Sequence, residues 1–187
     1  MPIVANSSFP LVQAARRHDA QAWDTLLKQH QLPLYAYVAE LTRDRHAALD
    51  LVQETFANAV RHIATLRDDS KFAGWLFGIA HQRCVQQFRR KRRHEDLFAD
   101  TDESADDLPD PTLDDPRDTL LRTEHSERFF ALVEKLPAAQ RSALLLHVLE
   151  NFPLEEIATI TAVPLGTVKS RLHHAKRALR QLVEDQP

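Results

Sequence analysis

The sequence predicts an all-α protein of two small helical domains joined by a flexible acidic linker. The composition favours helices over turn-rich strands, because the 187 residues include only 3 Gly, 43% are apolar and long stretches lack Pro. Apolar side chains recur at spacings of three and four residues on both sides of residues 95–118, a segment rich in Asp, Ser and Pro. We therefore assign residues 1–94 to a first domain, residues 95–118 to the linker and residues 119–187 to a second domain.

The first domain contains at least three predicted helices. One spans about residues 20–41 after a possible N-cap at Asp19, with a kink expected at Pro33. Asp44 can cap the second helix, and Ser70 is the expected cap of the third, which ends in a cationic run at 89–93. The buried stripe of the second helix is predicted to be Leu51, Val52, Thr55, Phe56, Ala59, Val60 and Ile63. That of the third is predicted to be Phe72, Trp75, Leu76, Ile79, Ala80 and Cys84.

The charge is divided unevenly along the chain. Residues 95–118 include eleven acidic residues and one basic residue, whereas residues 1–94 include fourteen basic and eight acidic residues. The linker has too few apolar side chains to offset the entropy of ordering it. A basic domain tied to an acidic strand indicates a nucleic-acid binder that carries its own polyanion, although a solubilising tether has the same composition.

The second domain is predicted to contain four helices. The first starts at Asp115-Pro116 and runs to about residue 136, and Pro137 starts the next, which ends near residue 150. The last two helices are predicted over 154–160 and from 165 to about 183, with a tight connection over 161–164. This arrangement is typical of a helix-turn-helix, which presents its second helix to the DNA major groove. The pair is expected to pack through Ile157, Ala158, Val163, Val168 and Leu172.

The outer face of the last helix consists almost entirely of hydrogen-bond donors. Such side chains suit phosphates and base edges, although a basic, solvated helix in an ordinary bundle shows the same pattern. The residues assigned to DNA binding are Thr167, Lys169, Ser170, Arg171, His173, His174, Lys176 and Arg177.

Both domains carry motifs of one known family. The second contains Leu136-Pro137, Gln140-Arg141, Glu156-Ile157-Ala158 and Gly166-Thr167-Val168-Lys169-Ser170-Arg171-Leu172. The first contains Asp50-Leu51-Val52-Gln53-Glu54-Thr55-Phe56, Trp75-Leu76, Ile79-Ala80 and the cluster at 89–93. In these motifs the chain resembles regions 4 and 2 of the extracytoplasmic-function sigma factors of bacterial RNA polymerase. They occur in the family's order and cover nearly the whole chain outside the linker.

The resemblance implies a non-catalytic subunit that binds core RNA polymerase and directs initiation at specific promoters. The second domain would read the −35 element and contact the polymerase flap. The polar face of the second helix would dock on the clamp helices of the largest subunit, through Asp50, Gln53, Glu54 and Asn58. The third helix would bind the −10 element as the duplex opens. The residues assigned to this contact are Lys71, Phe72, Gln82, Gln86, Arg89, Arg90, Arg92 and Arg93. Trp75 is assigned to the core instead.

Two further implications concern regulation and the linker. Most members of the family are held inactive by an anti-sigma protein, so such a partner is expected here. The family's linker threads toward the polymerase active site and RNA exit path, a route that suits an acidic strand.

Several positions depart from the family pattern. Leu49 stands where the family usually has Glu, and Gln82 and Gln86 stand where Asn and Asp are frequent. His173 and His174 occupy base-facing positions often held by bulky or Arg side chains, so both promoter elements are expected to be unusual. Ala162 replaces a common turn glycine, and a positive φ there would cost roughly 1 kcal/mol.

Other classes of site and function fit the sequence poorly. Cys84 is the single cysteine, the ten histidines are scattered without an HExxH motif, and no phosphate-binding glycine loop is present, so we expect no metal, cofactor or catalytic site. The chain shows no signal peptide or membrane span, so a cytoplasmic protein is expected. The alternatives are a stand-alone helix-turn-helix regulator, which would bind duplex DNA without polymerase, and a helical adaptor that binds no DNA.

Overall fold

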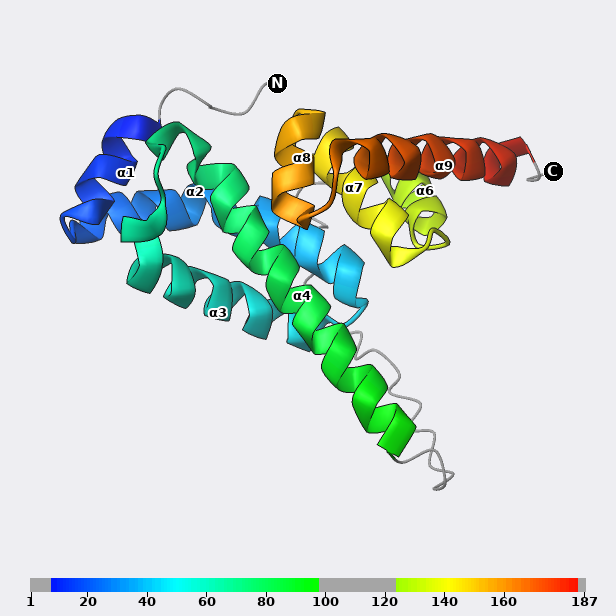
Figure 1. Cartoon of the computed structure of the whole chain (residues 1–187), viewed down its shortest axis with the longest axis horizontal. Helices are drawn as coiled ribbons and strands as arrows, with labels where there is room; N and C mark the ends of the chain where they lie inside the picture. The colour runs from blue at the N-terminus through cyan, green and yellow to red at the C-terminus, as the bar shows by residue number, and fades with distance from the viewer. Residues whose placement is uncertain (1–7, 98–123, 185–187) are drawn as a thin grey trace.

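The computed structural model describes residues 8–97 and 124–184, which are helices joined by short turns, with no strand among them. The first module contains α1 (Ser8–Arg16), α2 (Ala20–Thr42), α3 (Arg45–His62), the 3-10 turns η1 (Ile63–Thr65) and η2 (Asp69–Lys71), and α4 (Phe72–Leu97). The second contains α6 (Glu124–Val133), α7 (Ala138–Val148), α8 (Leu154–Thr161) and α9 (Leu165–Glu184). The predicted all-α class and the helix-turn-helix of α8 and α9 are confirmed (Figure 1).

Aspartates begin two of the helices as predicted, but the third cap differs. The Asp19 carboxylate accepts from two amides of the first turn of α2, and Asp44 accepts from the amide of Ala47 in α3. Ser70 was expected to cap α4 but lies inside η2, because Asp68 accepts from both the amide and the hydroxyl of Ser70. The prediction for Ser70 is therefore wrong, and a capped 3-10 turn leads into α4.

Helix α1 is absent from the sequence prediction. Its short apolar stripe is recognisable only in contact with the rest of the module, where Val12 and Ala15 are fully buried. The helix is fixed at its C-terminal end by Arg16, whose Nε donates to Asp69 Oδ1 at 2.9 Å. The N-terminal helix thereby holds the turn that precedes α4.

The helix boundaries around the linker differ from those predicted. Helix α4 continues to Leu97, past the expected domain end at residue 94. Helix α6 ends at Val133, before the expected residue 136. The expected helix start at Asp115-Pro116 and most of the linker lie outside the described residues.

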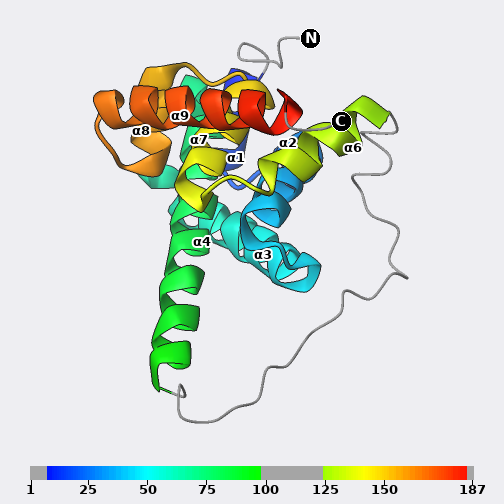
Figure 2. The same cartoon turned by 90° about the vertical axis from the view of Figure 1, so that its right-hand side faces the viewer.

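The apolar stripes pack into one core that is continuous across both modules. Helices α7 and α8 lie against α2 and α4, while the C-terminal part of α4 projects away from the body (Figures 1 and 2). The predicted stripe of α3 is buried except for Val60, which is 42% exposed. Modules of this size bury thin cores on their own, so a shared core adds stability that neither has alone.

Ala162 ends α8 in the left-handed conformation, with φ 53° and ψ 44°. An L-residue with a Cβ atom is strained in this region, whereas glycine is not. We therefore expect Ala162→Gly to raise the free energy of unfolding by about 0.5–1 kcal/mol, measured by chemical denaturation. The same change at Ala57, exposed within α3, should lower it by about 1 kcal/mol. Equal destabilisation by both changes would contradict the strain at Ala162.

Candidate nucleic-acid interface

Helix α9 presents a continuous polar face on the surface of the second module. Val168 and Leu172 anchor the helix in the core as predicted, and Ala175 is buried beside them. Six of the eight predicted DNA-binding side chains are exposed, and Thr167 and Arg171 are half-buried. The rings of His173 and His174 meet edge to face on this surface, with centroids 5.6 Å apart. The exposed residues are Lys169, Ser170, His173, His174, Lys176 and Arg177.

Helix α4 carries a second set of exposed polar and basic side chains. These are Gln82, Gln86, Arg89 and Arg90, preceded by Lys71 at the end of η2. The segment of α4 that follows them projects away from the body (Figure 2). The side chains of Arg92 and Arg93 lie outside the described set. An exposed helix with cations along it suits contact with a nucleic-acid backbone.

Phe72 was predicted both to belong to the buried stripe of its helix and to contact DNA, and the structure confirms the burial. Its side chain is 1% exposed and contacts the rings of Trp23, His30 and Trp75. Position 72 is the first residue of α4, and the end of the helix turns its ring toward α2. Trp75 is half-buried against this core, as expected. The ring of Phe72 therefore packs between α2 and Trp75 and is not available to stack on a base.

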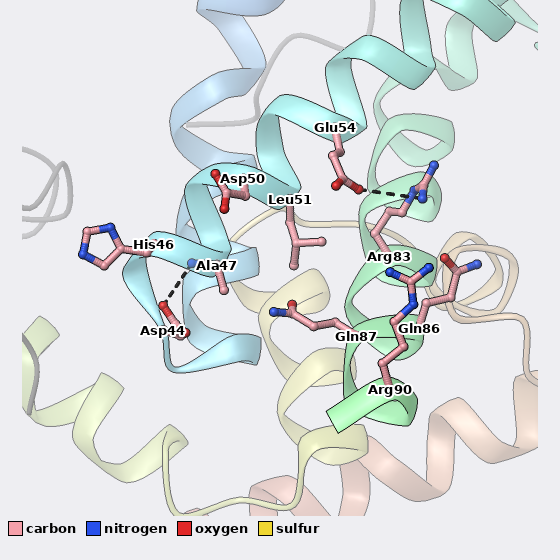
Figure 3. Close-up of a pocket in the computed structure, with 10 residues that line it drawn as sticks. All are labelled: Asp44, His46, Ala47, Asp50, Leu51, Glu54, Arg83, Gln86, Gln87 and Arg90. Atoms are coloured by element: carbon pink, nitrogen blue, oxygen red, sulfur yellow. Dashed lines mark hydrogen bonds and ion pairs between the residues drawn. The ribbon is translucent and has the colours of Figure 1, made fainter. Parts of the chain in front are cut away.

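The outer face of α3 borders a pocket of about 400 Å³ shared with α4 (Figure 3). Asp50, Gln53 and Glu54 are exposed there, as predicted for a docking face. Sequence spacing alone did not reveal Arg83 of α4, whose Nη1 lies 3.7 Å from Glu54 Oε2. With its amide oxygen turned toward α4, Asn58 accepts from Arg83 Nε at 3.1 Å. Arg83 thus ties the predicted docking face to the helix that carries the second basic set.

A buried polar cluster joins the two modules. The hydroxyl of Tyr37 on α2 lies 2.9 Å from His81 Nδ1 on α4 and 2.8 Å from Ser142 Oγ on α7. Burial raises the pKa of Tyr37, so the phenol stays protonated. A neutral imidazole can then accept from either hydroxyl at Nδ1. No motif identified this cluster, because Tyr37 and Ser142 are brought together only by the packing of the modules.

A second inter-module contact lies around helices α4 and α8 and the residues that precede them. The rings of Phe77 and Phe152 meet edge to face with centroids 5.4 Å apart, and Lys71 Nζ lies 3.1 Å from Glu156 Oε2. Phe77 is 1% exposed and stands outside the stripe predicted for α4. Its ring packs on Tyr37 of α2 as well as on Phe152 of the second module, and periodicity along α4 shows neither contact.

The packing of the modules is expected to keep His81 neutral in mild acid. Burial lowers its pKa to about 4, and Arg171 of α9 adds to this, while Tyr37 and Ser142 face it from α2 and α7. Separated modules would bind a proton near the ordinary pKa of 6.5, so a fall in pH from 6.5 toward 4 weakens the packed state. An NMR titration of the ring should show no protonation above about pH 5, with urea-unfolded chain as control. Titration near 6.5 in the native chain would contradict this burial.

The described residues were also searched for a metal-binding group and for a membrane-spanning helix. Among residues 8–97 and 124–184 no group of three His, Cys, Asp or Glu side chains is placed to hold a metal ion. Within the same residues, no helix combines the length and apolar character needed to cross a membrane.

Comparison with known proteins assigns both modules. Residues 26–94 match the family described as Sigma-70 region 2, and residues 126–179 match Sigma-70, region 4. The chain is 30% identical to the RNA polymerase sigma-H factor of Pseudomonas aeruginosa, over 93% of this chain and 92% of that protein. It is 31% identical to the ECF RNA polymerase sigma-E factor of Escherichia coli, over 93% of both.

Two solved structures share the fold. One is RpoE from Bartonella quintana in complex with the anti-sigma factor NepR, with a TM-score of 0.65 and 25% identity over 88% of this chain and 99% of that one. The other is CnrH in complex with the cytosolic domain of CnrY, with a TM-score of 0.69 and 19% identity over 97% of this chain and 100% of that one.

Proposed function

The chain belongs to the extracytoplasmic-function sigma factors, and we propose that its two modules divide the work of this family between them. The protein binds core RNA polymerase and directs it to promoter DNA. In our assignment residues 1–94 dock on the polymerase and take the −10 element, and residues 119–187 read the −35 element. Residues 95–118 connect them. Phosphodiester chemistry belongs to the polymerase, and we assign no catalytic step to this chain.

The observation that carries this assignment is the exposed donor face of α9. A recognition helix needs several exposed donors on one side and apolar anchors on the other, and α9 has both. Lys and Arg on this face suit phosphates, whereas the two imidazoles can each donate or accept at a base edge. We therefore assign base reading to His173 and His174, and backbone contacts to Lys169, Lys176 and Arg177.

The docking face of α3 supports the assignment of the first module. Asp50, Gln53 and Glu54 are exposed on one side of a helix that the core fixes on the other. Two carboxylates on a rigid helix suit an Arg-rich partner helix, such as the polymerase clamp provides. Arg83 positions Glu54 and Asn58 on this face.

The exposed side of α4 suits the opened −10 element. Bases that leave the stack need polar partners and a cationic track for the backbone, and Gln82, Gln86, Arg89 and Arg90 supply both kinds of group. Because Phe72 is buried, stacking on its ring is left out of this assignment.

Control by an anti-sigma protein is also proposed. The RpoE relative with the same fold has been solved with the anti-sigma factor NepR bound. A partner of that class would act on this chain by covering its polymerase-docking surfaces. Since polymerase and promoter DNA are its other partners, we expect the protein in the cytoplasm.

Site-specific photocrosslinking tests the division of labour. A photoreactive residue in place of His174 should crosslink to the −35 element in the polymerase–promoter complex, and one in place of Gln86 to the −10 element. The same residue at Lys28, which is exposed on α2 and belongs to neither set, is the control and should give no DNA crosslink. Crosslinking of position 174 to duplex DNA with equal efficiency in the absence of polymerase would favour the stand-alone regulator.

A further inference from the structure

The last turn of α1 is tied to residues 66–71, the segment that leads into α4. We propose that Arg16, at the end of α1, is a positioning residue for −10 recognition, because it fixes this segment and with it the predicted −10 contact Lys71. The inference rests on the proposed function, since it takes the −10 role of α4 as its premise.

Arg16 binds the segment at two points. Its Nη2 donates to the carbonyl oxygen of Leu66, and its Nε donates to Asp69 Oδ1 at 2.9 Å. Nη2 also lies 2.8 Å from the same carboxylate oxygen. The guanidinium is a rigid planar fork, so hydrogen bonds from two of its nitrogens fix the groups that it joins in both distance and direction. Residues 66 and 69 are thereby held in one arrangement against α1.

A second line of contacts runs from the same turn of α1 to the start of α4. The carbonyl oxygen of Ala15 accepts from Trp23 Nε1 at 3.1 Å. The indole of Trp23 in turn meets the ring of Phe72, the first residue of α4, with centroids 6.3 Å apart. Helix α1 is therefore connected to the segment itself and also to the residue that follows it.

Residues 66–71 depend on such contacts for their conformation. The 3-10 turn η2 covers only Asp69–Lys71, and Asp68 caps it. A connection without a continuous ladder of backbone hydrogen bonds opens more readily than a helix, so ties from outside decide its conformation. Arg67 and Lys71 are exposed on this segment, and its conformation sets where these two cations lie.

The placement of these cations matters for the opened −10 element. Phosphate contacts set the register of a protein on nucleic acid, and a base that leaves the stack is bound only by partners at fixed places. Lys71 stands directly before α4, whose exposed Gln82 and Gln86 are assigned to the bases. By holding the segment, Arg16 aligns its cations with these polar groups. Loss of Arg16 should weaken −10 binding and leave −35 binding by α9 unchanged.

Arg16 also neutralises a carboxylate beside the proposed DNA face. The side chain of Asp69 is 12% exposed, and without its partner it would repel phosphates. Removal of Arg16 alone therefore combines a loss of position with a repulsion. The double variant Arg16→Ala/Asp69→Asn removes both charges, so it retains only the loss of position.

Two DNA probes bound to holoenzyme isolate the −10 contact. Both are taken from upstream of the protein's own gene. One is a duplex that ends between the −35 and −10 elements, and the other continues as an unpaired non-template strand through the −10 element. Fluorescence anisotropy with labelled DNA gives the ratio of the two affinities. A loss of folded or polymerase-bound protein changes both affinities alike, so the ratio reports the −10 contact alone.

Arg16→Ala is expected to lower this ratio roughly tenfold, the size of a few charge-assisted hydrogen bonds, with the affinity for the −35 duplex unchanged. The charge-balanced double variant should lower it to a similar extent. Arg16→Lys keeps the charge but has one nitrogen in place of the fork, so we expect a loss of about threefold. The matched control is Arg17→Ala, which removes the exposed arginine at the next position and should keep the full ratio.

A wild-type ratio in Arg16→Ala would overturn the inference, and so would full recovery in the double variant or an equal loss in Arg17→Ala. If circular dichroism shows that Arg16→Ala does not fold, Arg16→Lys decides instead, and a wild-type ratio in that variant would overturn the inference. Failure of the proposed function looks different, because wild-type holoenzyme would then gain no affinity from the unpaired strand.

Discussion

Reversing two charges on α9 is expected to abolish most promoter binding without unfolding the protein. In Lys169→Glu/Arg177→Glu, two exposed cations assigned to phosphates become anions. We expect polymerase that carries this variant to bind promoter DNA on the order of 10²-fold more weakly, with the slope of log K against log salt reduced by about 2. Fluorescence anisotropy with labelled promoter DNA at several salt concentrations measures both quantities.

The matched control is Arg17→Glu/Lys28→Glu, which makes the same change of charge on exposed positions of the first module. It should leave the affinity and the salt slope within about twofold of the wild type, because neither position belongs to the faces assigned to DNA. Equal losses in both double variants would mean that net charge, and not the face of α9, governs binding.

The second large effect is expected at the docking face of α3. Asp50→Lys/Glu54→Lys places two cations where an Arg-rich partner is proposed to bind, and like charges at an interface cost several kcal/mol. We expect the affinity for core polymerase to fall roughly 10²-fold or more. Because both side chains are exposed, the free energy of unfolding should change by less than about 0.5 kcal/mol each.

Asp24→Lys is the control for that experiment, since Asp24 is an exposed carboxylate on α2 outside the proposed face. Polymerase binding is measured by fluorescence anisotropy of the labelled sigma factor, without DNA. Unchanged affinity of the α3 variant would show that polymerase does not use this face.

The parts of the fold that local patterns control were predictable. The carboxylates of Asp19 and Asp44 cap their helices because an N-cap depends on residues within one turn. The helix-turn-helix was predictable for the same reason, since spacing alone places Val168 and Leu172 inside and the donors outside. The positive φ of Ala162 was expected as well, because the turn between the two helices requires a residue in the left-handed conformation.

The contact between the modules was not predictable from these patterns. Ser142 hydrogen-bonds to Tyr37, which lies 105 positions earlier in the sequence. Periodicity within a helix gives no information about partners on other helices. Phe77 was missed for this reason, because the environment of its ring is supplied by other helices. Phe72 was placed correctly in the buried stripe, and its expected DNA contact came from the family resemblance and not from the periodicity. The contacts of Arg83 were not predicted for the same reason, since its partners Glu54 and Asn58 lie on another helix, α3.

The most direct test of the central claim is transcription by bacterial core polymerase with and without the purified protein, on DNA from upstream of its own gene. Many factors of this family activate their own promoters, so we expect a discrete transcript only when the protein is present. The Asp50→Lys/Glu54→Lys variant should fail to support it. If the protein gave no transcript but bound the duplex tightly without polymerase, the sigma-factor account would be contradicted in favour of a stand-alone regulator.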